Sequence, residues 1–148
     1  MRHAIRTQIK MAVVALVAGI ALTALEAAAQ TAALQGTWRS GDTTIRVVFT
    51  MGQVRGTFAT VGKAARELGF KPGDVSFTAV AVENYLHGVQ TLRYGGTCYP
   101  NGRPVAMMAR LTPDGRIMAI HTYAIRVDNL CRDTGEFSIS ENLWQRVQ

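Results

Sequence analysis

Few side chains in this sequence could take part in covalent or redox chemistry, and a pair of cysteines is the most informative of them. Cys98 and Cys131 are the only two cysteines in the chain. Such a pair forms a disulfide in an oxidising compartment, or supplies thiolates for a metal site or for nucleophilic attack. A metal site needs further ligands at suitable spacing, and no cluster of histidines or carboxylates supplies them. We therefore expect a disulfide between Cys98 and Cys131, with no bound metal and no free thiol nucleophile.

The other reactive groups give little support for catalysis. His87 and His121 are the only histidines outside the first ten residues. No serine lies in the sharp turn typical of hydrolase nucleophiles, and no glycine-rich loop opens a helix to hold a phosphate. Five acidic residues lie on expected strands or loops without forming an acid–base pair: Glu83, Asp128, Asp133, Glu136 and Glu141. The sequence thus predicts a protein that is not an enzyme and has no cofactor, and a residual hydrolase hypothesis depends on His121.

The first 33 residues have the layout of a secretory signal peptide. Three basic residues and no acid occupy the first ten positions, an apolar run covers residues 11–25, and small residues follow at 26–30. The alternative is an uncleaved membrane anchor. As a helix the apolar run would be roughly 22 Å long, which is short of the roughly 30 Å hydrocarbon core of a bilayer. We therefore expect a cleaved signal peptide.

The expected cleavage site divides the chain into a leader and one domain. We place cleavage after Ala29, with Ala33 as the second choice, so residues 1–29 form the leader and residues 30–148 a single small domain. The mature domain is then periplasmic or secreted. Disulfides persist in these compartments, which makes the expected Cys98–Cys131 bond plausible.

The charge pattern limits the partners of the mature domain. The formal charge of the whole chain is +6, and losing three basic residues and one acid with the leader reduces it to +4. These charges are scattered, whereas a nucleic-acid binder gathers them on one helix or stripe. We expect no nucleic acid and no stable membrane insertion after cleavage. The expected partner is a small apolar molecule or an envelope protein.

The mature domain has the pattern of an all-β protein, with turn signals at short intervals. One short helix is predicted at residues 63–68, ended by Gly69. Pro113-Asp114-Gly115 is the clearest hairpin turn. Eight strands are predicted, at residues 36–40, 43–50, 53–59, 75–83, 86–94, 104–112, 116–127 and 136–147.

Eight antiparallel strands in sequence order make either a closed up-and-down barrel or two packed sheets. Closure is favoured because it removes exposed strand edges. In this order the loops with Cys98 and Cys131 lie at the same end of the barrel, where they can lean across the intervening strand. We therefore predict an eight-stranded antiparallel up-and-down barrel with one short helix, preceded by a signal peptide. A barrel of this size is either filled by side chains or holds one small ligand.

The start of the first strand resembles a known superfamily. Leu34-Gln35-Gly36-Thr37-Trp38 is similar to the Gly-x-Trp opening of the calycins, the barrel proteins that include lipocalins and avidins. In lipocalins this tryptophan packs across the closed end of the barrel, beneath an arginine from the last strand. The resemblance therefore implies that Trp38 and Arg146 form a structural pair.

The comparison with avidins implies a shared barrel but a different ligand. Ser40 and Thr43 stand where the avidin pattern has polar ligand-binding residues. Phe58, however, replaces a tyrosine and has no hydroxyl to donate. Trp38 and Trp144 are the only tryptophans, so the tryptophans that wall the avidin site have no counterparts. Biotin binding is not expected.

Candidate ligand-binding residues depend on which side of each strand faces inward. Within residues 117–127, alternation puts His121 and Tyr123 on one face and the even-numbered residues on the other, and the sequence leaves the inward face open. On an inward face, His121 and Tyr123 would orient a small ligand in an apolar cup. Met107 and Met108 lie on opposite faces, so one of them fills the core. The candidate ligand-binding residues are His121, Tyr123, Met107 and Ser40.

Two functions follow from these expectations. The first is an exported, non-enzymatic barrel that binds a small apolar or amphipathic ligand. The alternative is a solid barrel that acts as a protein-interaction or inhibitor module through its loop rim. In that case the disulfide joins the loops at residues 99–103 and 128–135, and Arg103 and Arg132 are the candidate contact residues.

Overall fold

The computed structural model describes residues 33–82, 85–94, 98–99 and 101–147. The expected signal peptide lies outside these residues. One compact unit extends over Leu34–Gln148 and is described by itself below.

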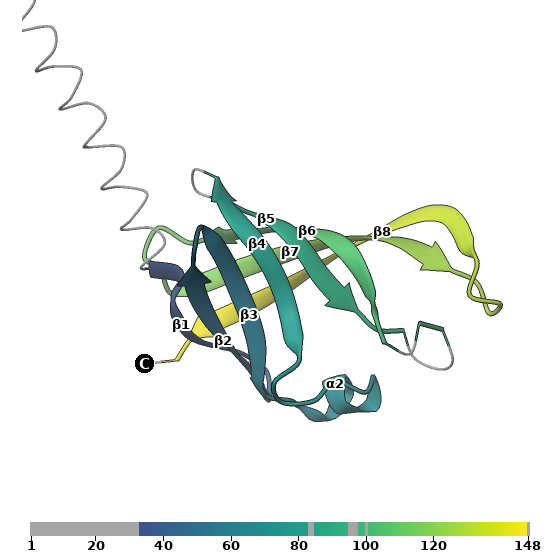
Figure 1. Cartoon of the computed structure of the whole chain (residues 1–148), viewed down its shortest axis with the longest axis horizontal. Coiled ribbons are helices and arrows are strands. Elements are labelled where there is room, and N and C mark those ends of the chain that lie inside the picture. Colours follow the sequence, from purple (N-terminus) through teal and green to yellow (C-terminus); the bar gives the residue numbers. More distant parts are fainter. Residues whose placement is uncertain (1–32, 83–84, 95–97, 100, 148) are drawn as a thin grey trace, which may run out of the picture. The chain divides into compact units, whose positions relative to one another are not determined.

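This unit is a closed barrel in which all eight strands are antiparallel and follow one another in sequence order (Figure 1). The expected fold class is therefore confirmed. The strands are β1 Gly36–Ser40, β2 Thr43–Thr50, β3 Gln53–Thr60, β4 Val75–Val82, β5 Tyr85–Leu92, β6 Arg103–Leu111, β7 Ile117–Val127 and β8 Asp133–Arg146.

The single short helix of the barrel, α2, connects β3 to β4 and is held against the barrel at both ends. It spans Lys63–Glu67, and its first backbone N–H donates to a carboxylate oxygen of Asp42, 2.9 Å away. After the helix, the Arg93 guanidinium lies 4.6 Å from the ring centre of Phe70 and 3.1 Å from Asp74. These contacts make α2 a fixed connection on the barrel wall.

The barrel closes through a short seam between its first and last strands. β1 pairs with β8 at Trp38–Arg146 and Arg39–Gln145 only. The Arg146 guanidinium lies 5.4 Å from the Trp38 ring, and the Trp38 indole N–H donates to the Leu34 carbonyl at 2.9 Å. A guanidinium over an indole contributes about 0.5–2 kcal/mol. The structure therefore places Arg146 over Trp38, as the resemblance to lipocalins implied.

One apolar cluster fills the barrel interior and includes Trp38 of this seam. Its members come from all eight strands, and the largest fully buried side chains are Trp38, Ile45, Phe77, Leu86, Met118 and Ile120. Because side chains alternate across a strand, these residues define the inward phase of each strand.

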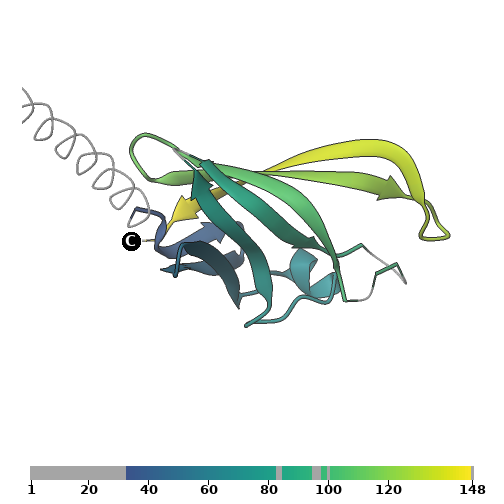
Figure 2. The same ribbon diagram turned by 45° about the horizontal axis from the view of Figure 1, so that its top comes forward.

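The hairpin of β7 and β8 extends well past the other strands of the barrel (Figure 2). β8 begins at Asp133, three residues before the expected start, and pairs with β7 along its length. Closure therefore does not remove every strand edge, contrary to the expectation, since β1 covers only the last part of β8.

The packing of Phe77 against Gly56 generates a stability prediction. The two residues pair across β3 and β4, and a Cβ atom at Gly56 would lie 2.4 Å from a ring carbon of Phe77. We expect Gly56→Ala to lower the free energy of unfolding by about 1–3 kcal/mol because the core is overpacked. Urea denaturation measures this loss.

Gly88→Ala serves as the matched control. A Cβ atom there would lie 2.1 Å from the backbone oxygen of Thr78, which no side-chain truncation can move. Adding Phe77→Leu should restore part of the stability lost with Gly56→Ala but none of that lost with Gly88→Ala. Equal recovery in both backgrounds would contradict this packing.

Candidate functional site

β7 faces the interior with its even-numbered residues. Met118 and Ile120 are fully buried and Thr122 is 2 % exposed, whereas His121 and Tyr123 lie on the outer face. His121 and Tyr123 therefore cannot line an interior site, which corrects their candidate role. The outward face carries a histidine and a tyrosine and the inward face a threonine and an arginine, so composition alone does not decide which face is buried.

A partly buried polar pair interrupts the apolar lining of the barrel. The Thr122 hydroxyl on β7 donates a hydrogen bond to the Gln90 carboxamide oxygen on β5. The two strands are separated by β6, whose Val105 pairs with Gln90 and whose Met107 pairs with Thr122. The pair therefore reaches across an apolar strand on the inside of the barrel, where an unpaired hydroxyl would be costly.

The inner face of β8 continues this polar region. Ser138, Ser140 and Asn142 alternate in phase with the buried Trp144, and Ser140 is the direct cross-strand neighbour of Thr122. We call Gln90, Thr122, Ser138 and Ser140 the polar inner layer, in which Thr122 is buried, Gln90 and Ser138 are half-buried and Ser140 is exposed. Along β7 and β8, the inner face thus changes from apolar near the seam to polar towards the disulfide.

Trp144 carries a buried hydrogen-bond donor without a partner among the described residues. The side chain is 6 % exposed, and its indole N–H meets no acceptor there. Buried tryptophan N–H groups normally find an acceptor. On β8, Trp144 lies one inward position beyond Asn142 and pairs with Met118, so this donor lies towards the apolar, seam end of the inner face.

Only two of the four predicted ligand-binding residues share the inward phase. Met107 is buried in the core cluster, where it packs as a filler. Ser40 is half-buried at the end of β1, in phase with Trp38. Sequence reasoning missed Gln90, Thr122 and Trp144. The aliphatic neighbours of Thr122 on the even face of β7 were the available signal, whereas nothing local distinguishes Gln90.

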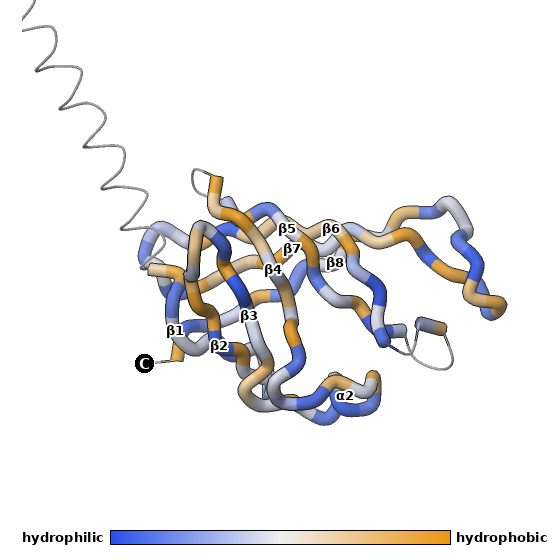
Figure 3. The backbone as a smooth tube through the Cα atoms, viewed as in Figure 1, coloured by the Kyte–Doolittle hydropathy of each residue, from blue (hydrophilic) through white to orange (hydrophobic). Residues whose placement is uncertain are grey.

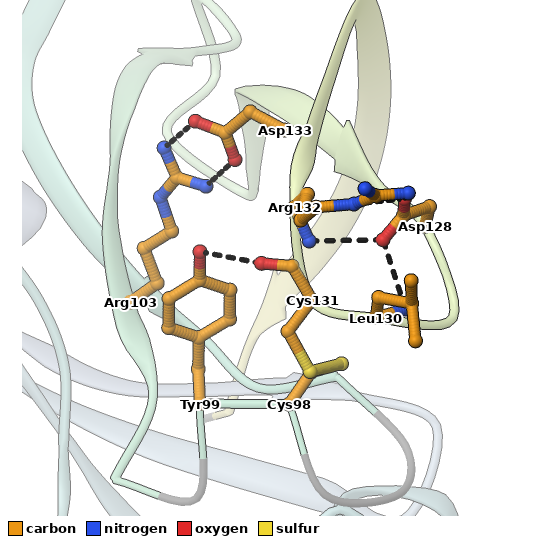
Figure 4. Close-up of a disulfide and its surroundings, with 8 residues drawn as sticks. All are labelled: Cys98, Tyr99, Arg103, Asp128, Leu130, Cys131, Arg132 and Asp133. Atoms are coloured by element: carbon orange, nitrogen blue, oxygen red, sulfur yellow. Dashed lines mark hydrogen bonds and ion pairs between the residues drawn. A yellow bond between two sulfur atoms is a disulfide. The ribbon is translucent and has the colours of Figure 1, made fainter.

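The disulfide between Cys98 and Cys131 is confirmed, with the two Cα atoms 5.2 Å apart (Figure 4). It joins the β5–β6 loop to the β7–β8 loop. The Tyr99 hydroxyl reinforces this link by donating to the Cys131 carbonyl at 3.3 Å. In the chain-entropy model, closing a loop of this size contributes about 3–4 kcal/mol.

Arg103, a candidate contact residue of the rim, is occupied within the rim itself. Its guanidinium forms two hydrogen bonds with the Asp133 carboxylate and lies 5.3 Å from the Tyr99 ring (Figure 4). Hydrogen bonding to Arg103 lowers the pKa of Asp133 below its ordinary value and raises that of Arg103. Arg103 therefore fixes the start of β8 relative to β6.

Arg132, the second candidate of the rim, is paired within its own loop. Its backbone N–H and its guanidinium both bond to the Asp128 carboxylate, which also accepts the Leu130 backbone N–H. These bonds lower the pKa of Asp128, the backbone N–H of Arg132 most of all. Both rim arginines thus shape loops, and neither offers an unpaired cation for a partner.

In the part of the chain that the structure describes, no group of three His, Cys, Asp or Glu residues is placed to hold a metal ion. None of its helices is both long enough and apolar enough to cross a membrane.

No protein-family model matches the chain, and no curated protein matches it.

The pair of Arg103 and Asp133 generates a prediction on pH dependence. Because the folded-state pKa of Asp133 is lowered, the stabilisation by this pair is present above the unfolded value of about 3.9 and is lost as the pH falls through the folded value. Asp133→Asn should therefore lower the urea midpoint at about pH 6 but not at about pH 2.

Glu67→Gln is the control for this experiment, because Glu67 is exposed on α2 and forms no ion pair with any described residue. It should leave the midpoint unchanged at both pH values. If Asp133→Asn also lowers the urea midpoint at about pH 2, the Asp133 carboxylate does not stabilise the fold through its charge.

Proposed function

We propose that this chain is an exported binding barrel that holds a small amphipathic molecule against its polar inner layer and catalyses no reaction on it. The observation that carries the proposal is the partly buried hydrogen bond between Thr122 and Gln90, beyond the packed core. Binding sites for small molecules are mostly apolar and place a few polar groups to fix orientation. The inner face of this barrel has that composition.

The two parts of the inner face suit two parts of a ligand. Val105, Met107 and Ala124 supply buried apolar surface around the Thr122–Gln90 pair. The Gln90 carboxamide, whose oxygen is bonded to Thr122, has N–H donors that suit a carbonyl or carboxylate oxygen. A molecule with a short apolar body and one hydrogen-bond-accepting group therefore fits better than a wholly apolar one.

Binding without catalysis agrees with the residues available at this site. Both described histidines, His87 and His121, lie on the outer face, so no general base reaches the polar inner layer from them. Serine hydroxyls without an adjacent base are weak nucleophiles. Export is supported by the Cys98–Cys131 disulfide, since such bonds persist in oxidising compartments.

Native mass spectrometry of the full chain, produced with its own N-terminal segment so that it can be exported and oxidised, tests the proposal. We expect a retained small molecule, or uptake of added decanoate as an amphipathic probe, measured also by titration calorimetry. Thr122→Val keeps the side-chain shape but removes the hydroxyl, and should weaken decanoate binding by about three- to tenfold.

Tyr123→Phe is the matched control, because it removes a hydroxyl from the outer face of the same strand. It should leave binding unchanged. The proposal fails if the wild type neither retains a molecule nor binds decanoate, or if Tyr123→Phe weakens binding and Thr122→Val does not.

A further inference from the structure

β8 has an edge that β1 leaves uncovered. β8 spans Asp133–Arg146, and β1 pairs with its last two residues only. From Asp133 to Leu143, the strand has β7 on one side and no described strand on the other. The projecting β7–β8 hairpin carries this edge away from β1 and β2 (Figures 1 and 2).

The direction of the backbone groups along β8 follows from two hydrogen bonds at its end. The Arg146 N–H donates to the Arg116 carbonyl on the β7 side, and the Val147 N–H donates to the Thr37 carbonyl on the β1 side, each at 2.9 Å. Backbone groups alternate in this way along an antiparallel strand. Four residues therefore direct their N–H and C=O groups to the open edge: Phe137, Ile139, Glu141 and Leu143.

The same residues place an apolar stripe on the outer face. Phe137, Ile139 and Leu143 are 74 %, 66 % and 52 % exposed. Apolar segments recur along the β7–β8 hairpin, as the hydropathy colouring shows (Figure 3). The only charged residue from Phe137 to Leu143 is Glu141, which lies 3.5 Å from His121 of the neighbouring strand.

Apart from Glu141, this edge lacks the usual protection against strand pairing. Natural edge strands carry lysines, prolines or bulges that prevent another strand from adding to them. Residues 137–143 contain neither lysine nor proline, and the register shift between β7 and β8 lies before them, at Ile125–Val127. An unprotected edge of unpaired N–H and C=O groups is completed by an extended strand.

We propose that the strand which covers this edge is β8 of a second copy of the chain, antiparallel and related by a two-fold axis at Ser140. The regular free edge begins at Phe137, beside the register shift, and ends at Leu143, where β1 takes over. An antiparallel strand overlaps fully with its own copy only when the axis passes through the midpoint of that segment, which is Ser140. An isologous contact of this kind closes on itself as a dimer.

The side chains agree with this register. It places Phe137 opposite Leu143 of the second copy and Ile139 opposite Glu141 of the second copy. Moving the axis to Glu141 would put the two Glu141 carboxylates opposite each other, and like charges in that position are unfavourable. A pairing register shifted by one residue would turn the apolar side chains of the second copy to the opposite face of the sheet. The proposed dimer follows from the open edge and not from the proposed ligand, although Ser140 at its centre also belongs to the polar inner layer.

Cysteine cross-linking of the full, oxidised chain tests the register. In the proposed dimer, Ser140 faces itself as a non-hydrogen-bonded pair with Cα atoms about 4.5 Å apart, which is within disulfide range. Ser140→Cys should form a covalent dimer under mild oxidation. Ser138→Cys is the matched control on the same face, because it faces Asn142 of the second copy and should not cross-link.

Sedimentation of two charge variants tests the same contact without new cysteines. Ile139→Glu faces Glu141 of the second copy and should weaken dimerisation at least tenfold, whereas Ile139→Lys faces the same carboxylate and should retain it. Val89→Lys, on the outer face of β5, should have no effect. Circular dichroism and thermal unfolding of each variant separate loss of pairing from loss of folding.

Three outcomes would overturn the proposal. A wild-type chain that stays monomeric at high micromolar concentration, with no cross-link at Ser140→Cys, means that the edge receives the strand of another protein or none. Equal cross-linking at Ser138→Cys means that the register is wrong. Dimerisation abolished by Val89→Lys but not by Ile139→Glu means that the outer faces pack and the edges do not pair.

Discussion

The contact of Arg146 with Trp38 holds the first and last strands together, and the rest of the barrel depends on this closure. Only two residue pairs join β1 to β8, and one of them is Trp38–Arg146 itself. The guanidinium covers the indole while the indole N–H is bonded to Leu34, so both sides of the seam are tied to the same buried ring. The core cluster packs directly on Trp38, and without the seam it would open to water.

The unequal lengths of the two seam strands produce both candidate binding surfaces. β1 has 5 residues and β8 has 14, so most of β8 extends beyond its partner. The excess strand, held by β7 and anchored at its start by Arg103 and the disulfide, presents polar side chains inward and apolar side chains outward. The inward side forms part of the polar inner layer, and the outer side borders the open edge. The difference in length between β1 and β8 thus gives β8 an inner side for the proposed ligand and a free edge for the proposed partner strand.

Much of the barrel, but little of its interior site, could be predicted from the sequence. Turn residues such as Pro113-Asp114-Gly115 and alternating apolar residues place all eight strands, and strand order brings Cys98 near Cys131. Alternation divides β7 into two faces but does not say which one the barrel encloses, because that depends on curvature and on strands distant in sequence. For the same reason, the hydrogen bond of Thr122 with Gln90, 32 residues away, has no local signal.

The indole N–H signals in a ¹H–¹⁵N spectrum test the central claim most directly, namely that the interior has a sealed end and a ligand-binding end. The chain has two tryptophans, Trp38 at the seam and Trp144 on the inner face of β8, four residues from Ser140 of the polar inner layer. Trp144→Phe assigns the two signals. On addition of decanoate, the Trp144 signal should move and the Trp38 signal, already bonded to Leu34, should stay. A shift of the Trp38 signal alone, or of neither signal while decanoate binds, would contradict the account.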